Sequence, residues 1–277
     1  MRLSRQVLIP LTAFSLLAAA AIAAGFAAPQ APRGGAGRGA AGAEGNAGPA
    51  PRWPNGGHVT LMSGKPGEAG LWLLGNGNGG SGTGVEVPYQ DWTRAVSDDR
   101  RQNNMEPHTR CKPSGGVRQF LTPYGVEFVE LPELQRIYIM DIGGPHTFRV
   151  IYMDARSHPG DLVPSYYGHS IGHWEGDTLV VDTVGFNEKF WIDRGQFPHT
   201  EALHLTERFT RTSASNMNYD YTIDDPGAYT APFSRSAAFT FRAGTELFEY
   251  VCQDNNFAPE LLVGTHGTVS RYSLIIP

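Results

Sequence analysis

The sequence predicts an all-β fold, a single antiparallel β-barrel of the lipocalin-like type, with a β-sandwich as the alternative. Beyond residue 117, short segments rich in Val, Ile, Tyr, Phe and Thr alternate apolar and polar side chains. Gly, Pro, Asn and Asp turns separate these segments, and only one stretch is typical of a helix. Many short strands with few helices are typical of barrels and sandwiches. The expected strands are 125–129, 136–142, 147–154, 178–184, 203–212, 217–223, 237–242, 246–253 and 269–276.

The N-terminal residues 1–28 are typical of a secretory signal peptide, with two arginines, an apolar run and small residues near its end. A permanent membrane anchor is the alternative, because the apolar run approaches the length that spans a bilayer. Residues 29–57 are mostly Gly, Ala and Pro, and we expect a disordered leader there. Residues 58–277 then form one β-rich domain, and the protein is expected to be periplasmic or secreted.

Two elements are expected before the strands. An apolar run and a Gly/Asn/Ser tract within residues 64–84 indicate a flexible loop, because no Lys-Ser/Thr follows the glycines to form a phosphate loop. Residues 88–104 carry a thin apolar stripe among charged side chains and predict a short N-terminal helix. Two loops, 155–175 and 185–202, are longer than connections require, and we expect them to pack over one end of the barrel.

The composition excludes several function classes. A net charge of −5 and a pI near 6.0 leave no basic patch for nucleic acid. We expect no stable membrane association after signal cleavage, and the oligomeric state is left open. The chain has no dinucleotide-binding glycine pattern, P-loop or haem-attachment motif, so no cofactor is predicted.

The two cysteines, Cys111 and Cys252, predict one long-range disulfide, because an even count in an exported chain is typical of a disulfide framework. Two separately buried thiols are the alternative.

Residues 168–204 concentrate the side chains that could carry chemistry. Histidines, carboxylates and two tryptophans surround one apolar strand there, and such clustering is typical of a functional pocket. The candidate catalytic residues are His169, His173, Glu175, Asp182, His199 and Glu201. The candidate substrate-binding residues are Arg156, Trp174, Asn187, Trp191, His204 and Glu207.

Strand alternation places three carboxylates on inward faces. Leu203, Leu205 and Phe209 share a face with Glu207, and Asp182 and Glu249 also have apolar neighbours two residues away. For Glu249 the opposite face, with Phe248, Tyr250 and Cys252, is the alternative core face. An inward carboxylate must be hydrogen-bonded, paired with a cation or protonated. The alternative to a catalytic role is a structural ion pair with Arg136, Arg149 or Arg208.

The long loop after residue 154 offers a second group. Asp154, Arg156 and His158 share strand parity, so Arg156 could clamp a carboxylate or carbonyl. A salt bridge between Asp154 and Arg156 within the turn is the alternative.

Two other chemistries have weaker support. His169 and His173 lie in what the glycines indicate is a turn, and His199, Glu201 and His204 match no ligand spacing, so no metal is predicted. Ser170 in GHSIG is similar to a nucleophile elbow, but no helix is expected after it.

Several runs resemble a widespread family of uncharacterised secreted bacterial proteins. They are PYG, RVIYMDARSHP, GHSIGHWEGDTLVVDTVGFNE, PHTEALH, TIDDPGAYT and EYVCQDN, between about residues 70 and 255. The resemblance implies one exported β-rich domain and carries over no catalytic residues.

Together these patterns predict an exported enzyme that uses side-chain acid–base catalysis, as a lyase, isomerase or hydrolase, on a small, partly apolar organic substrate. The alternative is a periplasmic small-molecule binding or carrier protein of the calycin type.

Overall fold

The computed structural model describes residues 48–74, 86–103, 106–193, 197–254 and 256, all within the compact unit Ala43–Pro277. The predicted signal peptide, most of the predicted leader and the predicted strand 269–276 lie outside the described residues. In the part of the chain that is described, no helix is long and apolar enough to cross a bilayer.

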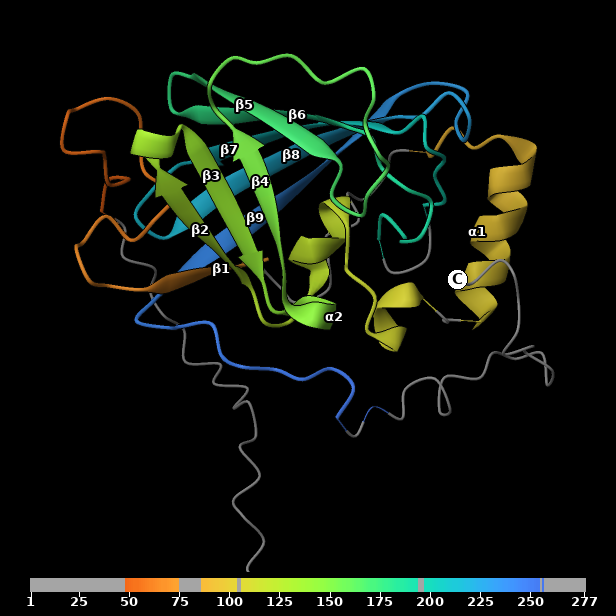
Figure 1. Cartoon of the computed structure of the whole chain (residues 1–277), viewed down its shortest axis with the longest axis horizontal. Coiled ribbons are helices and arrows are strands. Elements are labelled where there is room, and N and C mark those ends of the chain that lie inside the picture. The colour runs from red at the N-terminus through yellow and green to blue at the C-terminus, as the bar shows by residue number, and fades with distance from the viewer. Residues whose placement is uncertain (1–47, 75–85, 104–105, 194–196, 255, 257–277) are drawn as a thin grey trace, which may run out of the picture. The chain divides into compact units, whose positions relative to one another are not determined.

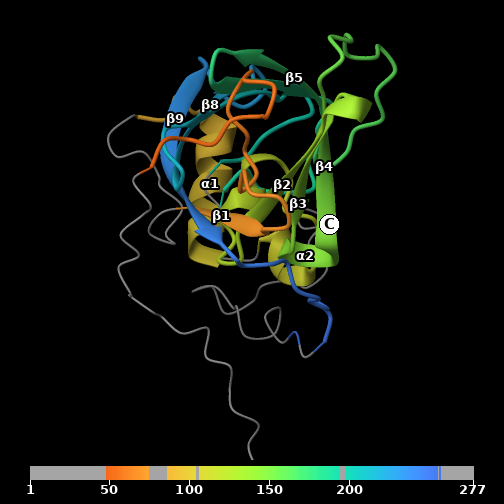
Figure 2. The same ribbon diagram turned by 90° about the vertical axis from the view of Figure 1, so that its left-hand side faces the viewer.

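Nine strands form a closed barrel in which each strand pairs with the next and β9 returns to β1 (Figures 1 and 2). The prediction of an all-β barrel is therefore confirmed, and the sandwich alternative is not. Every pairing is antiparallel except β4 with β5, which is parallel. The strands are β1 (Gly70–Leu74), β2 (Val126–Leu131), β3 (Arg136–Asp141), β4 (Thr147–Tyr152), β5 (His169–Glu175), β6 (Thr178–Val184), β7 (His204–Arg211), β8 (Asn216–Asp224) and β9 (Phe233–Ala243).

Three predicted elements differ from the structure. β1 forms where a loop was expected, because all five of its residues pair with β9. β5 forms where glycines indicated a turn, because each of its residues pairs with β6. The predicted strand 246–253 is wrong: these residues form no strand, and Glu249 is exposed rather than inward.

The predicted helix is confirmed as α1 (Asp91–Asn103), which lies at one end of the barrel (Figure 1). It is held there by hydrogen bonds to the turn after β8. Trp92 Nε1 donates to the Gly227 carbonyl (3.1 Å), and Thr93 Oγ1 donates to the Ala228 carbonyl (2.6 Å). A second helix, α2 (Gly143–His146), is one turn long and joins β3 to β4.

Aromatic side chains fill the barrel interior. Phe120, from the 3₁₀ helix Gly116–Leu121, packs edge-on against Phe209, Tyr219 and Phe239, with ring centroids 5.0–5.7 Å apart. This packing makes the interior a core rather than an open cup.

A buried ion pair crosses the same interior. Glu207 accepts hydrogen bonds from Arg149 and from Tyr219 Oη (2.8 Å). Arg149 also donates to Ser170 Oγ (2.9 Å) and Thr183 Oγ1 (2.7 Å). The prediction that Glu207 points inward is confirmed. Its partner is Arg149, so the structural ion pair that was the alternative to a catalytic role is present.

The two long loops behave differently. In the loop after β6, Phe186, Phe190 and Ile192 are buried and join the main core. Trp191 of the same loop is also buried. The loop after β4 instead carries His158 to the outer surface of the barrel, where it contacts β5 and β6.

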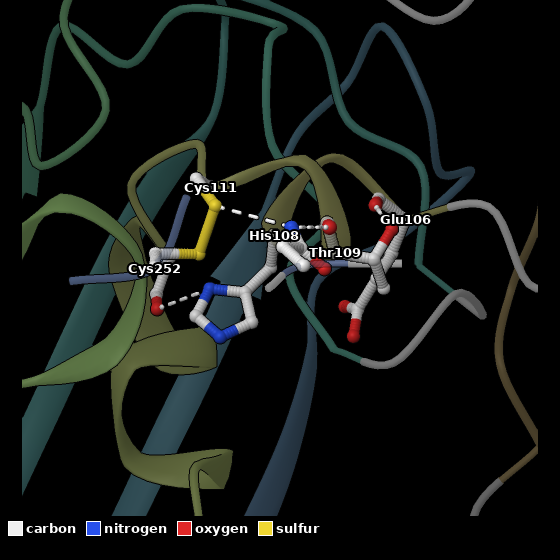
Figure 3. The surroundings of a disulfide bond; sticks show 7 residues. Glu106, His108, Thr109, Cys111 and Cys252 are labelled. Atoms are coloured by element: carbon white, nitrogen blue, oxygen red, sulfur yellow. Dashed lines mark hydrogen bonds between the residues drawn. A yellow bond between two sulfur atoms is a disulfide. The ribbon is translucent and has the colours of Figure 1, made fainter. Parts of the chain in front are cut away.

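The predicted disulfide joins Cys111, at the end of the 3₁₀ helix Pro107–Arg110, to Cys252 near the end of the described chain (Figure 3). The bond closes a loop of 141 residues. It ties the segment after β9 to the turn that follows α1.

Candidate functional site

Three histidines and one aspartate meet on the outer face of the barrel. His158 Nε2 lies 2.9 Å from Asp182 Oδ2, and His158 Nδ1 lies 2.8 Å from His169 Nδ1. His204 Nε2 is hydrogen-bonded to the other oxygen, Asp182 Oδ1. We call these four residues the histidine cluster.

The strand register explains why the cluster forms. Asp182 on β6 pairs with Ile171 on β5 and with Thr206 on β7. His169 and His204 each lie two residues before those partners, so both are diagonal neighbours of Asp182, within reach of long side chains.

The inward prediction for Asp182 is wrong. The inward side chains of β6 are Leu179, Val181 and Thr183, all fully buried, whereas the Asp182 side chain is 42% exposed. Both faces of β6 are apolar in sequence, so alternation could not decide between them.

The hydrogen bonds define which ring nitrogens carry protons when His158 is neutral. An ionised Asp182 only accepts, so His158 donates through Nε2–H, and its Nδ1 has a lone pair. His169 must then donate through Nδ1–H, which leaves its Nε2 unprotonated. Within the described part of the chain, this Nε2 has no hydrogen-bond partner.

The electrostatics favour this arrangement. Burial alone would raise the pKa of Asp182, but the hydrogen bonds from His204 and His158 outweigh it and lower the pKa. The pKa of His169 is also lowered, first by burial and then by the neighbouring His158 and Arg156. His169 is therefore a neutral imidazole at neutral pH, the state in which it can accept a proton.

Tyr152 and Arg156 flank His169. The His169 ring stacks on Tyr152 with centroids 5.0 Å apart, and the Arg156 guanidinium lies 3.9 Å from the centre of the Tyr152 ring. Arg156 is also hydrogen-bonded to Asp154, first among the causes that lower the pKa of Asp154 to about 2. The predicted turn salt bridge is thus present, and it holds Arg156 near the cluster.

A cleft of about 340 Å³ adjoins the cluster, and it is lined by His169 and by Tyr152, on which His169 stacks. Its remaining lining residues are Pro113, Thr147, Phe148, Arg149, Val150, Ser165, Tyr166, Tyr167 and Gly168. Four of its lining residues are Phe or Tyr, and hydroxyl groups and the His169 imidazole lie at its border.

Other predicted site residues lie apart from the cluster. His173 and Glu175, at the far end of β5, form an exposed network with Arg208. Trp174 stacks on His58 (3.8 Å) and lines a separate cavity of about 200 Å³. Glu201 is exposed in a turn before β7.

A further group of predicted residues is buried framework. His199 is buried against Phe190, its nitrogens face two backbone carbonyls, and burial lowers its pKa to about 4. Asn187 Oδ1 accepts a hydrogen bond from the Lys189 amide (3.0 Å). Trp191 is buried with the Arg100 guanidinium 4.5 Å from the centre of its ring.

The site residues predicted from the sequence therefore divide into a cluster and scattered positions. The structure brings together His169, Asp182, His204 and Arg156, and it adds His158 and Tyr152, which were not among the candidates. The sequence grouped His158 with Asp154 and Arg156 by strand parity, but β4 ends at Tyr152, so that pattern does not encode the contact of His158 with Asp182.

Comparison of the chain with known proteins identifies no relative. No protein-family model matches the chain, and searches of the curated proteins and of the solved structures find no match. Among the described residues, no three or more His, Cys, Asp or Glu side chains form a group that could hold a metal ion.

Proposed function

We propose that this protein is an exported enzyme that uses side-chain acid–base catalysis on a small, partly apolar organic substrate bound in the cleft beside His169. One observation carries the proposal: a neutral histidine with a free Nε2 borders a cleft, and its other nitrogen is fixed by His158. A base needs this combination of an accessible lone pair and a fixed orientation.

In the proposed reaction, His169 Nε2 removes a proton from the substrate. The positive charge that develops on His169 is stabilised through its Nδ1–H bond to His158 and, through His158, by the ionised Asp182. The Arg156 guanidinium, 3.9 Å from the centre of the ring of the cleft residue Tyr152, would attract a negative substrate group. Return of the proton to another atom would complete an isomerisation, and loss of a leaving group would complete an elimination.

The proposed location is the periplasm or the exterior of the cell. Two observations support it: the N-terminal pattern of residues 1–28 and the disulfide between Cys111 and Cys252, a bond that persists in oxidising compartments. The resemblance to secreted bacterial proteins is part of the same proposal.

The test is proton removal from 5-nitro-1,2-benzisoxazole, a small aromatic compound that opens to a coloured phenolate when a base takes the C3–H proton of its isoxazole ring and the N–O bond breaks. We expect His169→Gln to lower the protein-catalysed rate by roughly 100-fold or more, in the range typical of general bases. His173→Gln is the matched control, because His173 lies on the same strand and the same face but is 60% exposed and outside the cleft. Equal rates for the two variants would contradict the proposal.

His158 is a positioning residue in this scheme, and its variant separates orientation from folding. His158→Gln should keep the thermal stability but shift the pH at which the rate falls on acidification, because the group that faces His169 Nδ1 has changed. An unchanged pH profile would show that His158 does not act through His169.

A binding or carrier function is the second candidate, and a wider cavity favours it. This cavity, about 610 Å³, lies between the segment 48–68 and β9, and its charged lining residues are Arg242 and the ion pair of Lys65 with Glu68. A ligand held there would need no acid–base group. Copurified ligand identified by mass spectrometry, with no turnover in the assay above, would favour this candidate.

A further inference from the structure

The barrel wall has a gap beside the histidine cluster. β4 pairs with β3 along its whole length, from Thr147 to Tyr152. On its other side it pairs with β5 only at Ile151 and Tyr152. The preceding residues of β4 therefore have no strand partner on that side.

A glycine causes the separation. Gly168 has a φ of +61°, and the chain before it pairs with Phe186 through Ser165 instead of continuing along β4. A Cβ at Gly168 would lie 2.5 Å from the Val184 carbonyl oxygen, so a larger residue could not make this turn without displacing β6.

The cleft occupies this gap. Four consecutive β4 residues, Thr147 to Val150, line it on one side, and five consecutive residues, Ser165 to His169, line it on the other. Because side chains alternate between the faces of a strand, four consecutive lining residues mean that the backbone edge itself borders the cleft. Outside the β3–β4 ladder, Thr147, Phe148 and Arg149 make no backbone hydrogen bond to another described residue.

The edge is also unprotected. Free strand edges usually carry outward charges, prolines or bulges that prevent pairing with another chain. The outward side chains at this edge are the half-exposed Phe148 and Val150. Arg149 is turned into the barrel interior, and Thr147, on the same face as Arg149, is hydrogen-bonded through Oγ1 to Tyr167 Oη (2.6 Å). Arg149 Nη1 is buried and has no hydrogen-bond partner in the described chain.

We propose that the cleft binds a short, extended peptide, which adds to the free edge of β4 by backbone hydrogen bonds and places its end beside His169. Strand addition of this kind obtains affinity from the main chain and specificity from alternate side chains. The accessible aromatic lining, Phe148, Tyr152 and Tyr166, would contact uncharged side chains, whereas Tyr167 is buried beneath the cleft. The peptide site deepens the proposed function, on which it rests for its chemistry, by naming an amide-containing chain as the substrate class.

The probe is the blocked tetrapeptide acetyl-Thr-Val-Thr-Val-amide, which is uncharged and strand-forming. In ¹⁵N-labelled protein we expect its addition to shift the amide resonances of Thr147–Val150 and His169. The analogue with every amide N-methylated has nearly the same side-chain surface but no N–H donors, and it should bind roughly tenfold more weakly. Phe148→Lys should weaken binding roughly threefold, whereas Leu134→Lys, at an equally exposed position outside the cleft, should not.

The outcomes separate the peptide site from the proposed function. Equal binding of the two peptides, or shifts confined to other strands, overturns the peptide site even if proton removal still depends on His169. Peptide binding at the β4 edge that persists in His169→Gln supports the peptide site. If the His169 and His173 variants also remove the proton at equal rates, that result contradicts the catalytic proposal. Dimers that form through this edge, detected by size-exclusion chromatography and lost in Phe148→Lys, would overturn the peptide as its occupant.

Discussion

Replacement of Glu207 by glutamine should strongly destabilise the barrel. The side chains of Glu207 and Arg149 are 0% and 1% exposed, and the substitution leaves the Arg149 charge without its carboxylate. Breaking a buried pair by removing one partner costs about 3–5 kcal/mol. In a domain of this size, each kcal/mol lowers the melting temperature by about 2–4 °C, so we expect a decrease of roughly 6–20 °C.

The assay is thermal unfolding followed by circular dichroism, with an exposed ion pair as the control. Glu175→Gln removes the partner of Arg208, but both side chains are nearly half exposed and screened by water, so the melting temperature should change little. The double replacement of Glu207 by leucine and Arg149 by methionine removes both charges and should cost less than Glu207→Gln alone. A Glu207→Gln protein as stable as the wild type would refute the structural role and restore Glu207 as a substrate-binding candidate.

Three further predictions follow from buried groups and from the ligand chemistry. Replacing Cys111 and Cys252 by serine should lower the free energy of unfolding by up to about 5 kcal/mol in the chain-entropy model, measured by urea titration, and no change would show that the bond adds nothing. Burial raises the pKa of Asp141 from 3.8 to about 7, so between these pH values the folded state holds a proton that the unfolded chain has lost. The contribution of Asp141 to the free energy of unfolding is therefore fully present below pH 4 and is lost as the pH rises through 7. Asp141→Asn, which cannot ionise, should therefore gain stability relative to the wild type over that window, by an amount on the order of 4 kcal/mol, whereas a pH-independent difference would contradict the raised pKa. Elemental analysis of the purified protein should find less than roughly 0.1 equivalent of zinc, iron or copper, and stoichiometric metal lost on replacing His204 would redirect the mechanism to metal-activated water.

The fold was largely predictable because its strands carry their own pattern. In β7, the inward positions Leu205 and Phe209 and the preceding Leu203 are strongly apolar, so alternation correctly placed Glu207 inside. In β6 the same rule failed, because Val180 and Val184 on the outer face are as apolar as Leu179 and Val181 on the inner face. A carboxylate between two valines therefore looked buried when it was on the outer surface.

The candidate site was only partly predictable, because its parts come from segments distant in the sequence. Glycines at 168 and 172 indicated a turn, and only the ladder with β6 makes His169 a strand residue and a diagonal neighbour of Asp182. His158 reaches the cluster from a loop whose path depends on the tertiary structure, a contact that strand parity does not encode. His199 lies in the histidine-rich stretch, yet its burial against Phe190 removes it from the surface.

The protonation state of His169 tests the central claim most directly, and ¹⁵N NMR of the histidine rings across a pH titration measures it. We predict that neutral His169 carries its proton on Nδ1, leaves Nε2 unprotonated, and titrates below the ordinary value of 6.5. The exposed His173, on the same strand, is the internal reference. A His169 ring protonated on Nε2, or one that titrates at or above 6.5, would contradict the account, because His169 would then have no free lone pair with which to act as the base.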